Sequence, residues 1–419
     1  MKLFYIYVVM LILLPTGSIF GVNVKMLVFL PLLFAAVRLM AQEPNALLSV
    51  SWNFAILCAF LSWAVLLLFQ PFNDPLMALS QLKDVLTTLI GCWIIRLFVR
   101  SEKEKERFIR VCIYAVAFSG FLKVVIFVYA FATGISVSSI VEGISNQFGV
   151  VLMSLDLGDV GGRISFVSDT LLPICIFALL CLRKRLGITG LKASVALAFL
   201  LISDLYTFAR FTWGYTVVAI VLAFLVSERD KMHKWFIAAC SAVVAFFSQT
   251  IFAMIAFRFS LDLVSSSDEV RVWQIKALKE FFWNAPFFGA GLGSHPINFI
   301  RAIEHPYFYE VQILAIAGQV GLIGLSLFVV ILFNYYRKSF NFSSNIRYQI
   351  AVLVLLICFL ANGFFNPSLL SSAAAVNFGL LFMLASLGMH DRRTVVIPSR
   401  SGPGQRGDCD IESCSALYH

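Results

Sequence analysis

Charged side chains are scarce in this sequence, and this scarcity excludes most soluble functions. Asp, Glu, Lys and Arg make up 13% of the 419 residues and hydrophobic residues make up 60%, with a mean hydropathy of +0.90. An ordinary soluble domain carries about 25% charged residues. The formal net charge of +9 is not gathered into a basic patch of the kind that binds nucleic acid. We therefore expect lipid to be the main solvent of this chain.

Several motifs of catalytic chemistry are also missing. The chain has no G-x-x-x-x-G-K-[ST], no H-E-x-x-H and no G-x-S-x-G, so ATP-driven work, zinc-dependent hydrolysis and serine hydrolysis are not expected. Of nine cysteines, seven lie inside apolar runs, and no spacing predicts a zinc or disulfide framework. Asp408-Cys409-Asp410 has the form of an Asp-x-Asp metal site, but it lies in the C-terminal tail. We expect no metal and no cofactor.

Long apolar runs are abundant. Windows of apolar residues between charged or Gly/Pro breaks predict an all-α polytopic membrane protein with about 12 transmembrane helices. The predicted spans are 3–20, 24–41, 47–70, 84–100, 108–134, 166–183, 190–208, 211–228, 234–256, 309–334, 346–366 and 371–389. The first is expected to be a retained helix, because no small-x-small cleavage site follows it. Residues 1–391 would form the bundle, and 392–419 a disordered tail.

Lys and Arg are concentrated in alternate loops, which predicts the orientation. The basic loops lie at 100–110, 183–192, 229–234, 337–347 and 392–393. Short loops rich in Lys and Arg face the cytoplasm, so both termini and the tail are expected there. Two loops on the opposite side are long for a compact domain, about 30 residues at 135–165 and about 50 at 257–308. Long ordered loops of this kind usually carry function.

Two arginines on the outer side are candidates for function. Arg210 falls near a membrane boundary, where an arginine costs a few kcal/mol unless it is paired or reaches water. It could also be a snorkelling side chain or pair with Asp204. Arg271 lies in a segment, 268–283, whose apolar residues follow the helical period and predict an amphipathic helix resting on the membrane. The alternative is an ordinary surface arginine.

The same loop carries glycines and a histidine. Gly289 and Gly291 permit either a tight turn or a close approach of the backbone to a ligand. His305 directly precedes the predicted tenth span, where a neutral imidazole could take a proton from a sugar hydroxyl. A structural histidine, or Glu304 as the base, are the alternatives. Arg163 is one of the few other basic residues on this side and a possible supporting residue.

Taken together, these segments resemble the bacterial O-antigen ligase and O-antigen polymerase superfamily. Three stretches carry the resemblance: Thr207–Trp213, Arg271 through the glycines of 289–293, and His305-Pro306-x-Phe308 running into 318–324. The family usually has Asn where this chain has Pro306, and Ser where it has Ala209. The resemblance covers 200–330 most closely and implies a ligase-like core at 160–366, with a periplasmic loop at 257–308 between spans nine and ten.

The resemblance implies a metal-independent enzyme of the bacterial inner membrane. It would transfer a glycan from undecaprenyl diphosphate to a sugar hydroxyl on the periplasmic face, in O-antigen, lipopolysaccharide or exopolysaccharide biosynthesis. Arg210 and Arg271 match the arginines that hold the diphosphate, and His305 matches the general base. Guanidinium groups pair bidentately with phosphate oxygens and stabilise the growing charge of the leaving group. We expect the two arginines to share one site.

Two branches of the superfamily fit. A ligase would pass the polymer to lipid A core oligosaccharide, and a polymerase would pass it to another lipid-linked repeat unit. The alternative from another class is a flippase for lipid-linked glycans, or another polysaccharide transporter. Such a protein should place charges midway along its helices, and Lys123 is so placed.

Overall fold

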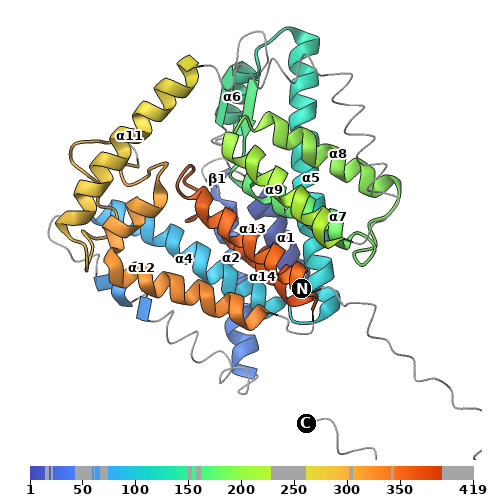
Figure 1. Ribbon diagram of the computed structural model, residues 1–419, viewed down its shortest axis with the longest axis horizontal. Helices are drawn as coiled ribbons and strands as arrows, with labels where there is room; N and C mark the ends of the chain where they lie inside the picture. Colours follow the sequence, from blue (N-terminus) through green and yellow to red (C-terminus); the bar gives the residue numbers. More distant parts are fainter. Residues whose placement is uncertain are drawn as a thin grey trace, which may run out of the picture.

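The computed structural model describes residues 1–14, 18–19, 22–42, 59–60, 62–66, 74–148, 153–156, 162–227, 261–301, 305–340 and 344–388. This part of the chain is mostly helical (Figure 1). The helices are α1 (Lys2–Leu13), α2 (Val24–Gln42), α4 (Pro75–Phe98), α5 (Glu102–Thr133), α6 (Val137–Phe148), η3 (Val167–Leu171), α7 (Leu172–Leu182), α8 (Leu191–Tyr206), α9 (Arg210–Val226), α11 (Leu261–Asn284), α12 (Gln312–Ser339), α13 (Ile346–Asn362) and α14 (Ser372–Leu387). Two short antiparallel hairpins pair β1 (Ser18–Ile19) with β2 (Val22–Asn23) and β3 (Met153–Asp156) with β4 (Gly162–Ser165).

Three helices in the described ranges, α4, α5 and α12, are long and apolar enough to cross a membrane. Five shorter apolar segments accompany them: Lys2–Leu13, Ser168–Leu182, Arg210–Val226, Ile346–Asn362 and Ser372–Leu387. The helical fold and its apolar character agree with the prediction. The count of twelve spans is not confirmed, and 234–256 and most of 47–70 lie outside the described residues, as does the tail at 392–419.

Most predicted spans match a helix, and the two clear departures have local causes. α4 begins at Pro75 rather than at residue 84. Asp74 caps it by accepting a 2.9 Å hydrogen bond from the N–H of Leu76, and Pro75 occupies the first turn, where proline is favoured. α1 ends at Leu13 rather than at residue 20, and the β1–β2 hairpin follows it.

The short connection between the predicted spans 190–208 and 211–228 is present in the structure as a tight turn. α8 ends at Tyr206 and α9 begins at Arg210, and Phe208 between them has a positive φ of 48°. The carbonyl of Asp204 accepts hydrogen bonds from Thr207 Oγ1 at 2.7 Å and from Trp213 Nε1 at 2.8 Å. These bonds satisfy the end of α8 and hold Arg210 at the start of the next helix.

Helix α14 occupies the centre of the described bundle, beside α4, α12 and α13 (Figure 1). Nearly all of its side chains are buried. Small residues allow this close packing, because a Cβ placed on Gly91 of α4 would meet Ala375 at 2.6 Å, and one on Gly379 would meet Ile95 at 2.7 Å. Interfaces between membrane helices are rich in such small residues.

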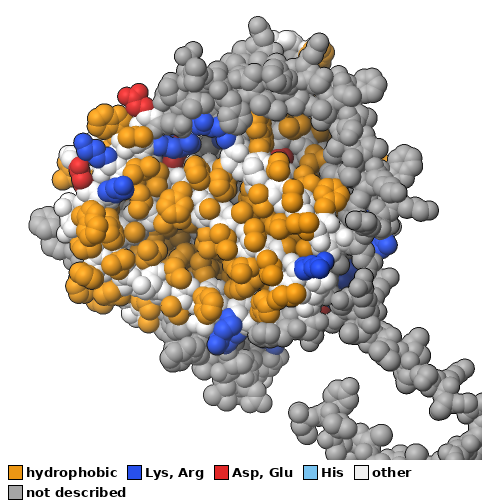
Figure 2. Space-filling model, viewed as in Figure 1, with side chains coloured by type: hydrophobic (Ala, Val, Ile, Leu, Met, Phe, Trp, Pro, Cys, Tyr) orange, Lys and Arg blue, Asp and Glu red, His pale blue; other side chains and the backbone are white. Residues whose placement is uncertain are grey.

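The outer surface of the bundle is largely apolar. Figure 2 shows a broad area of hydrophobic side chains, with Lys and Arg gathered along its upper and lower borders. Exposed apolar residues on α12 and α13 include Leu322, Val329, Phe333, Ile350 and Ile357. Broad exposed apolar areas of this kind are uncommon on soluble monomers. This is the surface that lipid would cover.

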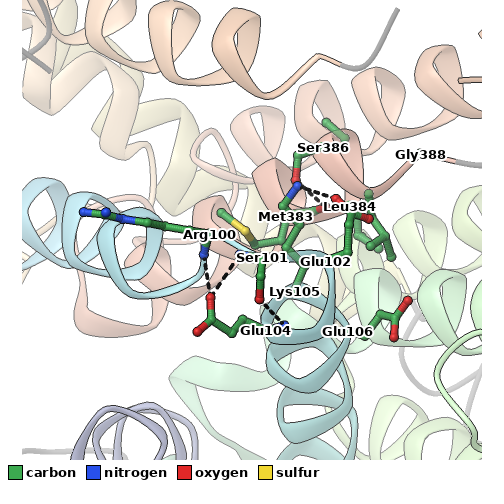
Figure 3. Close-up of polar contacts among 12 residues, drawn as sticks. Arg100, Ser101, Glu102, Glu104, Lys105, Glu106, Met383, Leu384, Ser386 and Gly388 are labelled. Carbon is green, nitrogen blue, oxygen red and sulfur yellow. Dashed lines mark hydrogen bonds and ion pairs between the residues drawn. The ribbon is translucent and has the colours of Figure 1, made fainter. Parts of the chain in front are cut away.

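An ion-pair junction joins three helices at the N-terminal end of α5. Arg185, between α7 and α8, contacts Glu106 through Nε at 2.9 Å and Glu102 through Nη2 at 2.6 Å. Its Nη1 donates to the carbonyls of Leu387 and Gly388 at 3.1 and 3.0 Å. Figure 3 shows how the start of α5 faces the end of α14 at this junction. Arg185 thereby satisfies two carbonyl groups that α14 leaves unpaired.

We predict that Arg185→Gln lowers the stability of the purified protein in detergent by about 2–4 kcal/mol, because it removes charge-assisted hydrogen bonds from two helix ends. The measurement is the thermal unfolding midpoint. Lys192→Gln is the matched control, since Lys192 is an exposed cation close by in the sequence. Equal midpoints for Arg185→Gln and the wild type would show that the junction contributes nothing to stability.

Candidate functional site

Helix α12 is broken at Gly321, where φ is 67° and ψ is −179°. The glycine-rich segment 286–291 pairs with the break through four backbone hydrogen bonds. They run from Leu322 N to Pro286 O (2.8 Å), Ile323 N to Phe287 O (3.2 Å), Ala290 N to Gly318 O (2.9 Å) and Gly291 N to Gln319 O (3.0 Å). The segment therefore completes the backbone pairing that the broken helix lacks.

The glycines in this pairing are required by space. A Cβ on Gly289 would strike the carbonyl oxygen of Gln319, and one on Gly321 would strike the carbonyl oxygen of Phe287. Gly289 and Gly291 also have positive φ angles of 77° and 103°, which side chains disfavour. Of the two roles considered for these glycines, a tight turn or an approach to a ligand, the structure shows a tight turn against another backbone.

Two buried glutamines fasten this segment to the rest of the site. Gln81 of α4 donates to Gln319 Oε1 and accepts the N–H of Gly293 at 2.5 Å. Gln319 donates to the carbonyls of Ser294 at 3.0 Å and Tyr307 at 3.3 Å. Both glutamines are nearly inaccessible, and polar side chains of this kind link helices in apolar surroundings. In the sequence, the only signal for these two residues is an amide side chain within an otherwise apolar run.

His305 is exposed at the start of the segment leading into α12. Its ring lies edge-on to Tyr307 with the centroids 5.9 Å apart, and Tyr307 contacts Ser80 of α4 at 2.9 Å. Asp84 of α4 lies within electrostatic range of His305 and lines a small cleft together with Tyr307. Glu304, the alternative base, lies outside the described residues.

Arginines from distant parts of the chain meet at Glu310. Arg271 of α11 contacts Glu310 Oε2 through Nε at 2.9 Å, and Arg301 contacts Oε1 through Nη2 at 2.6 Å. Burial lowers the pKa of Arg163 on β4, while the nearby carboxylates of Asp169 and Glu310 act in the opposite direction. The structure thus brings Arg271, a predicted site residue, into contact with Glu310, and Arg163 lies within electrostatic range of the same carboxylate.

Arg210 is half-buried at the first residue of α9. The ring of its neighbour Phe211 stacks on Phe365 at the end of α13, with centroids 4.9 Å apart. Asp204, the alternative partner considered for Arg210, is buried and lies within electrostatic range of Asp169 and Lys123. The sharing of one site by Arg210 and Arg271 stays a prediction.

The predicted helix at 268–283 is confirmed, and α11 extends it to Leu261–Asn284. Its apolar residues divide between two surroundings. Ala277, Leu278 and Phe281 are buried, and Leu278 and Phe281 cluster with Tyr309, Val311 and Ala315, next to the start of α12. Val270 and Trp273, which the period placed on the same stripe, are 46% and 54% exposed. The helix therefore packs on protein through its C-terminal half and leaves apolar side chains exposed near Arg271.

Among the residues that the structure describes, no group of three His, Cys, Asp or Glu side chains is arranged to hold a metal ion. Metal-independent chemistry stays a prediction. No protein-family model matches the chain, and no curated protein matches it. The family resemblance therefore depends on the residues and spacings quoted for it.

We predict that Gly321→Ala destabilises the protein by roughly 2 kcal/mol or more, because the new Cβ must move the carbonyl of Phe287 and the residue has a positive φ. Gly214→Ala is the control, since a Cβ there meets no atom within 4 Å. The measurement is the thermal midpoint of each variant in detergent. A Gly321→Ala protein as stable as the Gly214→Ala protein would contradict the proposed importance of the break.

Proposed function

We propose that this protein is a glycosyltransferase of the bacterial inner membrane, of the O-antigen ligase or polymerase type. It transfers a glycan from undecaprenyl diphosphate to a sugar hydroxyl during surface polysaccharide biosynthesis. The observation that carries the proposal is that one short segment, 305–310, presents both a histidine and the carboxylate at which Arg271 and Arg301 meet. Transfer from a diphosphate needs a base for the acceptor and positive charge for the leaving group.

The reaction requires little beyond these groups. The acceptor hydroxyl oxygen attacks the anomeric carbon of the donor sugar, and the bond from that carbon to the phosphate oxygen breaks. His305 takes the hydroxyl proton, and the lipid diphosphate leaves with the bonding electrons. Arg210 and Arg271 would hold the diphosphate and stabilise its growing charge.

The proposed topology has twelve spans with both termini in the cytoplasm. The basic residues of 100–110 and 183–192 lie at the N-terminal end of α5, where Arg185 makes its ion pairs. α5 has 32 residues and is roughly 48 Å long, and α6 with the β3–β4 hairpin follows its other end. Loops rich in Lys and Arg face the cytoplasm, so α6 and β4, which carries Arg163, would face the periplasm. Arg271 and Glu310, the latter near Arg163, would share that side.

We predict that deleting the gene changes the lipopolysaccharide of the bacterium that carries it, because the enzyme that transfers the lipid-linked glycan is then absent. Core oligosaccharide carrying a single repeat unit would identify a polymerase. Bare core with accumulated lipid-linked polymer would identify a ligase. The measurement is gel electrophoresis of lipopolysaccharide together with analysis of the lipid-linked pool. Unchanged lipopolysaccharide and exopolysaccharide in the deletion strain would refute the proposed function.

We predict that His305→Ala reduces transfer roughly a hundredfold or more while expression and donor binding stay intact, because a sugar hydroxyl needs a positioned base. His295→Ala is the control, as the other histidine of the same loop, and should retain activity. The measurement is glycan transfer by purified protein in lipid. Near-normal activity of His305→Ala with an inactive Glu304→Gln would assign the base to the carboxylate instead.

A transporter of lipid-linked glycans is the second candidate, and one observation favours it. Lys123 and Asp169 form a fully buried ion pair of 2.7 Å, and Asp204 nearby has a buried Oδ1 with no hydrogen-bond partner. Ionisable groups inside a membrane bundle often mark the path of an ion or substrate. If the protein is a flippase, the Lys123→Met variant should lose translocation of the glycan. The His305→Ala variant, which changes only the proposed transfer step, should still translocate it.

A further inference from the structure

Helices α5 and α8 leave an apolar groove between them on the surface of the bundle. The two helices touch at Gly120, where a Cβ would strike the carbonyl oxygen of Phe199. Beside this contact the ring of Phe121 stands edge-on to that of Phe199, with the centroids 5.5 Å apart. The groove runs from there toward the first residues of α8 and has a volume of about 400 Å³. A groove of this size can hold a ligand.

The lining of the groove suits a hydrocarbon chain. Apart from Lys192 and the hydroxyl of Tyr114, it consists of aromatic and aliphatic groups, including the side chains of Phe118 and Val195. Tyr114, Phe118 and Val195 are exposed. α5 is one of the helices long and apolar enough to cross a membrane, so the surface around the groove would face lipid. From Tyr114 to Phe121 the helix rises about 10 Å, which gives an acyl chain a continuous apolar path.

Positive charge gathers at the other end of the groove, where α8 begins. Lys192 is the second residue of α8, is exposed and lines the groove. Arg110 lies one turn before Tyr114 on the same face of α5. Its Nη2 is 3.9 Å from the position that a Cβ on Gly187 would take, so it reaches the loop that leads into α8. α8 starts without a side-chain cap, and the N-terminus of a helix carries partial positive charge.

The two helices supply no carboxylate of their own for this charge. Glu102 and Glu106, at the start of α5, contact Arg185 instead. After Glu106, α5 contains no further Asp or Glu, and residues 183–203 contain none. Nε of Arg110 is buried and has no hydrogen-bond partner. A buried donor of this kind calls for an acceptor, and the positive charge around it favours one that is an anion.

We propose that this groove binds an anionic phospholipid. One acyl chain lies between α5 and α8, and the phosphate lies at Lys192, Arg110 and the N-terminus of α8. Anionic headgroups are attracted to Lys and Arg at a membrane surface, and the aromatic side chains cover the acyl chain. The basic loops at this end face the cytoplasm in the proposed topology, so the lipid belongs to the cytoplasmic leaflet. The site is therefore separate from the proposed transfer site, which faces the opposite side.

The test measures lipid binding by the purified, delipidated full-length protein in detergent, using native mass spectrometry. The wild type should bind phosphatidylglycerol roughly tenfold more tightly than phosphatidylcholine, because each cation near an anionic headgroup adds to the attraction. Lys192→Gln should weaken phosphatidylglycerol binding roughly threefold to tenfold and leave phosphatidylcholine binding unchanged. Val195→Trp should weaken the binding of both lipids, because the indole fills the groove.

Each variant has a matched control that carries the same substitution outside the groove. Lys279→Gln removes an exposed cation from α11, and Val221→Trp enlarges an exposed side chain on α9. Neither residue lines the groove, so both variants should bind the two lipids as the wild type does. Thermal midpoints establish that each variant is folded. If Val195→Trp does not fold, the comparison of Lys192→Gln with Lys279→Gln decides the question.

Equal affinity of the wild type for the two lipids would overturn the proposal, and so would unchanged phosphatidylglycerol binding by Lys192→Gln. Displacement of the lipid by glycerol phosphate alone would also overturn it, because the acyl chain would then contribute nothing. A second copy of the chain is the other occupant that the test detects. In that case Val195→Trp would change the gel-filtration profile and leave lipid binding unaltered, which would refute the lipid site.

Discussion

The break in α12 at Gly321 is the constraint on which the arrangement of α11 and of the segment before α12 depends. A helix interrupted in apolar surroundings exposes backbone groups that have no water to bind, so protein must supply their partners. Residues 286–291 supply them through hydrogen bonds of 2.8 to 3.2 Å. Because these residues directly follow α11, the pairing also fixes the end of that helix against α12. Arg271 of α11 then meets Glu310, which lies two residues before α12 begins.

Polar side chains that pair with one another inside the apolar bundle position the other parts of the site. Gln81 and Gln319 tie α4, the glycine-rich segment and the backbone beside His305 into one network. Lys123 and Asp169 pair at 2.7 Å in the interior. Charges and amides buried in this way are stabilised only when their partners are in place.

Much of the helical framework could be predicted from local hydropathy, as the matches at α5, α7, α12 and α14 show. The turn between α8 and α9 and the helix through Arg271 were also predicted. The early start of α4 was missed because Lys83 and Asp84 interrupt the apolar run, although a helix tolerates charges on one exposed face. The role of Glu310 was missed because its partner Arg271 is 39 residues away, and no spacing rule connects residues at that distance.

What this sequence determined alone is what depends on neighbouring residues: its apolar character, the approximate positions of most helices, and the order of Arg210, Arg271 and His305 along the chain. Tertiary structure decided which of these residues meet. It set the glycines of 289–291 against the backbone of α12 and placed Arg163 near Glu310. The reason is that hydropathy acts residue by residue along the chain, whereas an ion pair depends on how separate helices pack, and that packing is set by the shapes of many side chains at once.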